Sequence, residues 1–128
     1  MKLLTVYIIM LLFLSTGKTL AFPSEIIQAF RNGNITELSG ILNSRIEVTI
    51  HNKENICDKK KAIELINAFL TTHTPTNFVV KHEGGKNNFH FAIATLYTVS
   101  GNFRIYFLMQ ADNEKQIINQ IRIDNLNE

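Results

Sequence analysis

Cysteine is almost absent from this chain, with Cys57 the only one among 128 residues. A single cysteine excludes an internal disulfide and the zinc sites that are built from cysteine pairs. The fold must therefore depend on side-chain packing for its stability. Cys57 itself has two interpretations, a small buried hydrophobic residue or a reactive thiol.

The histidines also lack the spacing of a metal or catalytic motif. None of the four has a helical i, i+4 partner that would place two ligands on one face of a helix. They are His51, His73, His82 and His90. Gly84-Gly85-Lys86 lacks the Ser/Thr and the helix of a phosphate loop, so it indicates a hairpin turn. The sequence predicts no metal site, no cofactor and no catalytic residue.

Only one long hydrophobic run is present, and it lies at the N-terminus. Leu3 to Leu14 is apolar except for Thr5, and small residues follow up to Ala21. A charged start, an apolar core and a small-residue end are typical of a secretory signal peptide. We expect cleavage after about Ala21, a single domain over residues 22–128, and export to the periplasm or the extracellular space. The alternative is an uncleaved membrane anchor, although the run is shorter than the ~20 residues of a spanning helix.

An excess of one charge is missing from the predicted mature domain. Without Lys2 and Lys18, the 13 basic residues fall to 11, which equals the 11 acidic residues. A neutral domain has no general attraction to nucleic acid or to anionic lipid. We expect a protein or a small ligand as partner, no nucleic acid, and a membrane only if the N-terminal segment stays in place.

The first half of the chain predicts three helices and one strand. Ser24 is expected to cap a helix that Gly33 ends, and Asn34 to cap a second helix with Glu37 as its reciprocal partner. Arg45 to His51 alternates as a half-buried strand does. Asp58 caps a longer helix from Lys59 to about Thr72, with a core face of Ala62, Ile66, Phe69 and Leu70. Pro75 prevents its continuation.

The second half predicts an antiparallel meander. Its strands are expected over 77–83, 89–99, 102–110 and 116–124, with turns at 84–88 and Ser100-Gly101. A further turn is expected at 53–55, before the long helix. The order α-α-β-α-β-β-β-β indicates an α+β fold, with the N-terminal helices packed on one face of a curved antiparallel sheet.

Alternation along these strands separates two faces of the sheet. A turn at Ser100-Gly101 would pair Thr98 with Phe103 and Tyr97 with Arg104. Alanines 92 and 94 and Leu96 would then lie opposite Met109, Phe107 and Ile105. The expected inward residues are Phe103, Ile105, Phe107, Met109, Ile117, Ile121 and Ile123.

The opposite face carries the best candidate for recognition. Tyr97, Arg104, Tyr106 and Arg122 are expected to lie together on it. Arginine beside tyrosine can stack and still present donors, and both residue types are enriched in protein interfaces. The alternative is cross-strand pairing that only stabilises the sheet.

Four segments of the chain resemble a known family. They are Val79–Gly85, Ala92–Leu96, Gly101–Phe107 and Gln120–Ile123. They are similar to domain of unknown function 4783, a family of small exported proteins found mainly in Bacteroidota. The resemblance implies a nuclear transport factor 2-like, or cystatin-like, α+β cone. It implies no activity and no catalytic residues.

Two functions from different classes fit these observations. The first is a non-enzymatic interaction or small-ligand-binding module, with a homodimer through the sheet face as one form. The second is a pocket enzyme of the isomerase or dehydratase type, which needs an Asp or His base inside the cone. The nearest bases are His82, His90 and Asp124, and alternation places them at the outer face or at strand ends.

Overall fold

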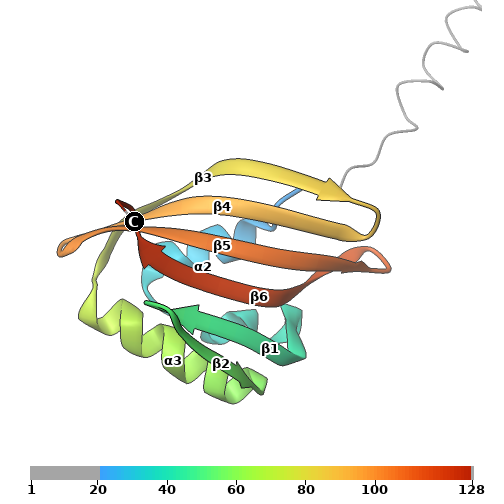
Figure 1. Cartoon of the computed structure of the whole chain (residues 1–128), viewed down its shortest axis with the longest axis horizontal. Helices are drawn as coiled ribbons and strands as arrows, with labels where there is room; N and C mark the ends of the chain where they lie inside the picture. The colour runs from blue at the N-terminus through green and yellow to red at the C-terminus, as the bar shows by residue number, and fades with distance from the viewer. Residues whose placement is uncertain (1–20, 128) are drawn as a thin grey trace, which may run out of the picture.

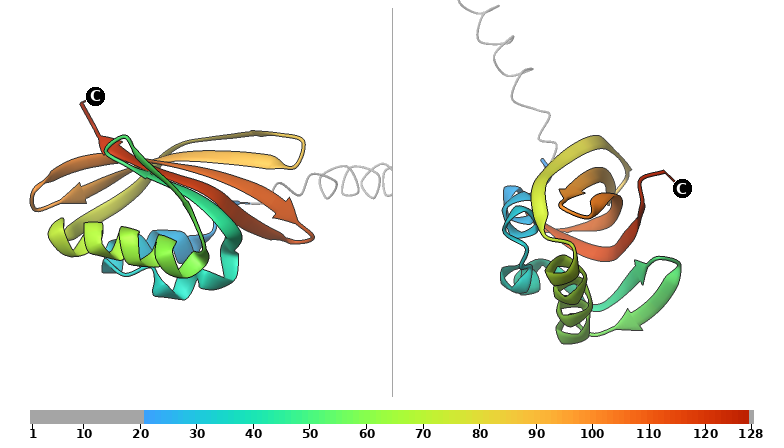
Figure 2. Two further views of the ribbon diagram at one scale, coloured as in Figure 1. Left: turned by 60° about the horizontal axis from the view of Figure 1, so that its bottom comes forward. Right: turned by 90° about the vertical axis from the view of Figure 1, so that its left-hand side faces the viewer.

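The computed structural model describes residues 21–127, so the predicted signal peptide lies outside the described residues except for Ala21. Six strands form one sheet, and the helical segments pack against one side of it (Figures 1 and 2). Along the chain the elements are α2 Ser24–Asn32, the 3-10 helix η1 Thr36–Ile41, β1 Leu42–Ile50, β2 Lys53–Cys57, α3 Lys59–Thr72, β3 Pro75–Lys86, β4 Phe89–Thr98, β5 Gly101–Asp112 and β6 Lys115–Asn125. Among residues 21–127, no helix has both the length and the apolar character needed to span a membrane.

The predicted α+β class and helix-covered sheet are confirmed, but the sheet is not wholly antiparallel. Its strand order is β2-β1-β6-β5-β4-β3. Strand β1 runs parallel to β6, with Val48 opposite Ile121 and Ile50 opposite Ile123. This pairing joins residues more than seventy positions apart, so local alternation carries no information about its direction.

Helix α3 forms as its sequence predicts. The Asp58 side chain accepts a hydrogen bond of 2.8 Å from the Lys61 N–H, which caps the helix. Its buried residues are Ala62, Ile66, Phe69 and Leu70. At the first helix, Gly33 adopts the left-handed conformation at φ 74° and ends α2, also as predicted. Ser24 is instead the first residue of α2, and no side chain caps that end.

The second predicted helix is a short 3-10 segment. The Asn34 side-chain oxygen accepts from the N–H and the hydroxyl of Thr36, at 2.9 and 2.6 Å. Asn34 thus turns the chain rather than capping an α-helix with Glu37. The side chain of Asn67, from α3, accepts the Ile35 N–H at 2.8 Å and so ties the two segments together.

The turns of the β1–β2 and β3–β4 hairpins differ from the prediction, because asparagine adopts the left-handed conformation in each of them. His51 and Asn52 have φ of 50° and 67° and close the β1–β2 hairpin. The predicted turn at 53–55 is therefore the start of β2. Asn87, at φ 59°, closes the β3–β4 hairpin, so Gly84 and Gly85 lie within β3. Asparagine tolerates this region of φ better than most residues, which explains both shifts.

The β4–β5 register differs from the prediction by two residues. Thr98 pairs with Gly101, so the turn residues are Val99 and Ser100. Ala92, Ala94 and Leu96 consequently face Phe107, Ile105 and Phe103. Because side chains alternate along a strand, a shift of two leaves every residue on its predicted face.

The β5–β6 pairing joins the apolar faces of the two strands, with one irregularity near its end. Ile105 pairs with Ile123 and Phe107 with Ile121. An irregularity between Leu108 and Met109 then places Ile118 opposite Met109. Ile118, not the predicted Ile117, is therefore the buried residue.

Aromatic side chains fill the space between the helices and the sheet. Phe30 of α2 stacks on Phe78 of β3 with ring centroids 5.2 Å apart, and it meets Phe107 of β5 edge-on at 5.6 Å. All three are fully buried. The interior of the cone is thus packed with apolar rings.

Candidate functional site

The outer face of the sheet, away from the helices, carries all four residues predicted for recognition, each half-buried. Tyr106 pairs with Arg122, and Arg104 lies between Thr95 and Asp124. These three predicted residues are brought together. Tyr97 lies opposite Asn102 rather than Arg104, because the hairpin turn is one residue earlier than predicted and the pairing register therefore shifts by two.

The charges on this face are partly matched within the sheet. Arg122 Nε donates to Asp124 Oδ2 at 2.7 Å, and its Nη2 donates to Asn52 Oδ1 at 3.1 Å. The hydrogen bond to Asp124 raises the pKa of Arg122 above its ordinary value. Burial, followed by repulsion from Glu54, raises the pKa of Glu47 on the neighbouring strand.

Phe91 belongs to the same outer face, although it was not among the predicted recognition residues. Its ring stacks on Tyr106 at 6.4 Å, and Phe91 is 36% exposed. Gly84 lies opposite Phe91, and a Cβ at Gly84 would come within 2.5 Å of that ring. A glycine inside a strand often marks such a close approach, so Gly84 is the sequence signal for this contact.

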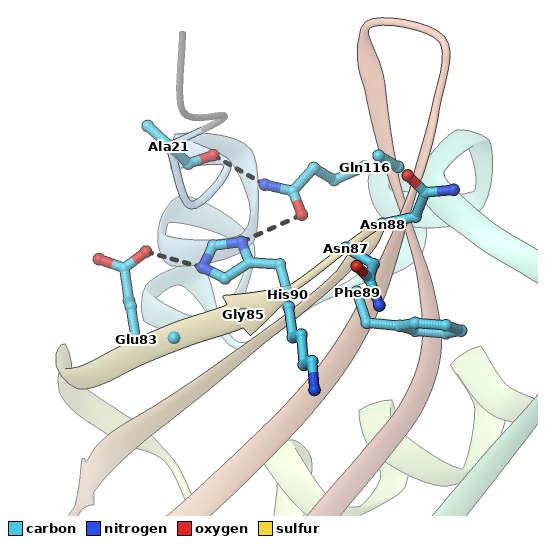
Figure 3. A pocket seen from close by; sticks show the side chains of 11 residues that line it. Ala21, Glu83, Gly85, Asn87, Asn88, Phe89, His90 and Gln116 are labelled. Carbon is cyan, nitrogen blue, oxygen red and sulfur yellow. Dashed lines mark hydrogen bonds and ion pairs between the residues drawn. The ribbon is translucent and has the colours of Figure 1, made fainter. Parts of the chain in front are cut away.

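A separate cleft of about 600 Å³ lies at the β3–β4 hairpin (Figure 3). Its lining is Ala21, the hairpin residues 83–90, Ala111 and Gln116. It is outside the apolar interior of the cone, so it is not the internal pocket that a base inside the cone would require.

A row of hydrogen-bonding groups crosses this cleft, with His90 at its centre. The His90 Nε2 is 3.3 Å from Glu83 Oε1, and its Nδ1 is 3.1 Å from Gln116 Oε1. Gln116 Nε2 in turn donates to the Ala21 carbonyl at 3.3 Å. Sequence reasoning singled out His90 but missed Gln116, which is only 6% exposed. The position of Gln116 in its strand does not predict its burial, because the β3–β4 hairpin and Ala21 are what cover it.

The other candidate bases are not part of this row. His82 is exposed on β3, and Asp124 is hydrogen-bonded to Arg122. Burial raises the pKa of the Cys57 thiol, with Asp58 adding to the effect, which disfavours the reactive thiolate. Within residues 21–127, no three His, Cys, Asp or Glu side chains are grouped so that they could hold a metal ion.

Two histidines flank an aromatic pair at the C-terminal end of α3. The His73 ring is 4.5 Å from Phe69 and 4.7 Å from Phe103, and His51 contacts the same two rings at 5.8 and 5.9 Å. Burial, followed by repulsion from His51, lowers the pKa of His73 below its ordinary 6.5.

We expect His73 to make the fold less stable in acid. The unfolded chain takes up a proton near the ordinary pKa, whereas folded His73 resists it, so stability falls as the pH drops below about 6.5 and on through the lowered pKa. Thermal unfolding at about pH 7.5 and about pH 5 measures this loss. His73→Asn should make the loss smaller, and His82→Asn, an exposed control, should not. Equal losses in all three proteins would contradict the assignment.

Comparison with known proteins places this geometry in a family. The family model described as a domain of unknown function, DUF4783, matches residues 23–124. A family member from Bacteroides ovatus ATCC 8483 is 32% identical, with a TM-score of 0.79 over 86% of this chain and 100% of that chain. One from Bacteroides fragilis YCH46 is 36% identical, with a TM-score of 0.76 over 82% and 99%.

More distant structures support the fold alone. An NTF2-like protein of unknown function from Shewanella baltica OS155 is 11% identical, with a TM-score of 0.63 over 79% of this chain and 85% of that chain. No curated protein matches the sequence. The fold is thus NTF2-like, as the resemblance implied, and the chain belongs to the DUF4783 family of domains of unknown function.

Proposed function

We propose that this protein is an exported, non-enzymatic recognition domain that binds a protein partner through the outer face of its sheet. The observation that carries the proposal is the contrast between the two faces. The inner face is occupied by fully buried rings such as Phe30, Phe78 and Phe107. The outer face presents half-exposed rings and arginines that no helix covers.

The composition of the outer face supports binding rather than sheet pairing alone. Phe91 and Tyr106 stack, and Lys81 lies 6.0 Å from the centre of the Tyr97 ring. Aromatic and arginine side chains are enriched among the few residues that carry most of the binding energy of interfaces. Pairing within the sheet accounts for the Arg122–Asp124 contact along β6, but it leaves Phe91 partly in water at an energetic cost.

A second copy of the chain is the partner to test first. Arg104→Ala and Tyr106→Ala should each weaken self-association at least tenfold, about the effect of losing 1.4 kcal/mol at an interface. Sedimentation or light scattering of the exported protein, up to high micromolar concentration, measures this. Val99→Ala removes an exposed apolar side chain from the β4–β5 turn, off the sheet face, and is the matched control. A monomer at all concentrations, unchanged by either variant, would exclude the dimer.

The second candidate is a pocket enzyme or small-ligand carrier that uses the cleft at the β3–β4 hairpin. Glu83 and His90 favour it, because a carboxylate within 3.3 Å of an imidazole is a common acid–base pair. The cleft also has enough volume for a small ligand. Against turnover, both side chains belong to one hairpin, and the cleft is open rather than sheltered inside the cone.

A further inference from the structure

The Gln116 side-chain amide forms hydrogen bonds with two groups, the Ala21 carbonyl and the His90 ring. Its Nε2 donates to the Ala21 carbonyl oxygen, which can only accept. Its Oε1 must then face His90 Nδ1, which therefore carries a proton. The other ring nitrogen, Nε2, faces the Glu83 carboxylate, which also only accepts (Figure 3). A neutral imidazole has one N–H, so a neutral ring cannot donate to both neighbours at once.

Cleavage after Ala21 would change the first group in this row from an acceptor to a donor. The carbonyl of Ala21 leaves with the signal peptide, and the nitrogen of Phe22 becomes an α-ammonium. That nitrogen is bonded to the same carbonyl carbon, so it starts about 2.3 Å from the oxygen that Gln116 now contacts. An ammonium only donates hydrogen bonds.

The new N-terminus would stay beside Gln116, because Phe22 is held by packing. Phe22 is 9% exposed, and its ring meets Phe107 edge-on at 5.5 Å. The next residue, Pro23, accepts the Ile26 N–H at 3.2 Å and so leads directly into α2. Both contacts are made by residues after the cut and involve none of residues 1–21, so they would remain in the mature chain.

We propose that the Gln116 amide is the binding site for the mature N-terminal ammonium, and that removal of residues 1–21 reverses the hydrogen bonds through His90. The side-chain amide of Gln116 flips, so that its Oε1 accepts from the ammonium of Phe22 and its Nε2 donates to His90 Nδ1. His90 Nε2–H then donates to Glu83. The bonds from the ammonium to Gln116, from Gln116 to His90 and from His90 to Glu83 then all form with a neutral ring. This inference rests on the export that the proposed function includes.

The reversal has a consequence for the cleft. Ala21 and Gln116 line both the hairpin cleft and a smaller neighbouring cleft of about 370 Å³. Processing removes Ala21 from between them and puts a positive charge beside Gln116. The β3–β4 hairpin is then linked to β6 and to the start of α2 by a hydrogen-bond network that is complete only in the exported protein.

The test compares the protonated nitrogen of His90 in the exported protein with that in two variants. The full chain is expressed with its own leader, and the mass of the exported product identifies its first residue. Nitrogen-15 NMR near pH 7.5, where histidine is mostly neutral, then reports the tautomer. We expect Phe22 as the first residue and at least a tenfold excess of the Nε2–H tautomer of His90. Gln116→Met removes the donor to Nδ1 and should reduce this excess to what the Glu83 carboxylate alone sustains, whereas Gln28→Met, at an exposed position of α2, should leave it unchanged.

Gln116→Glu separates the direction of the bonds from simple packing. A carboxylate still accepts from the ammonium, but it cannot donate to His90 Nδ1, so the Nδ1–H tautomer should gain population. An Nδ1–H ring in the exported wild-type protein that begins at Phe22 would overturn the inference and leave export intact. A product that begins elsewhere would also overturn it. A full chain retained uncleaved in the cell would overturn both the inference and the proposed export.

Discussion

Phe107→Ala is expected to lower the free energy of unfolding by about 3–5 kcal/mol. Phe107 is fully buried in the centre of the sheet, where Phe22, Phe30 and Phe78 all contact its ring. These rings come from the segment before α2, from α2 and from β3, so none can move into the space without breaking another contact. Urea unfolding followed by circular dichroism measures the loss.

A variant on the opposite face is the control for this prediction. Phe91→Ala removes the same side chain from a position that is 36% exposed, so its cost should be smaller by several-fold. Similar losses in the two variants would mean that the interior is not packed as described. The cavity in Phe107→Ala should also bind small apolar molecules such as benzene, which the packed wild-type interior excludes.

Gly85→Ala is expected to destabilise the protein by about 1–3 kcal/mol. A Cβ at Gly85 would lie 2.6 Å from the Phe89 carbonyl oxygen and 3.3 Å from the His90 Cα. Both are backbone atoms of the paired strand β4, so the hairpin must shift to make room. The same shift would displace His90 from Glu83 and Gln116. Thermal unfolding together with the NMR signals of His90 measures both effects.

Two other glycines calibrate this prediction. A Cβ at Gly40 has nothing within 4 Å, so Gly40→Ala should leave the stability unchanged or slightly raised. A Cβ at Gly84 meets the Phe91 ring, which can rotate away, so Gly84→Ala should cost less than Gly85→Ala and should disturb the outer face instead. A Gly85→Ala protein as stable as the Gly40→Ala protein would contradict the close strand approach.

The packed interior of the cone limits where the protein can bind a partner. A cone whose interior is closed by Phe30, Phe78 and Phe107 has to act through its surface. The surface offers the outer face around Tyr106 and the cleft around His90. The first is extended and aromatic, as a protein interface is, and the second is concave and polar.

Most of the fold could be predicted because its determinants are local. The Asp58 cap, the Gly33 stop and the apolar stripe of α3 each depend on residues within a few positions of one another. Strand alternation assigned Arg104 and Tyr106 to the outer face, and it would do so in any register shifted by an even number. The turns were less well predicted, because Asn52 and Asn87 compete with nearby glycines and lysines for the left-handed positions.

The sequence by itself determined which residues of β4 and β5 face inward, where the main helix begins, and that the sheet carries aromatic and arginine side chains on its free face. Only the tertiary structure decided that β1 joins β6 in parallel, that rings fill the cone, and that Glu83, His90 and Gln116 meet beside Ala21. The physical reason is distance along the chain. Alternation and capping depend on neighbouring residues, whereas the β1–β6 pairing and the contacts of Gln116 join residues from 26 to 95 positions apart, which come together only when the sheet closes over the helices.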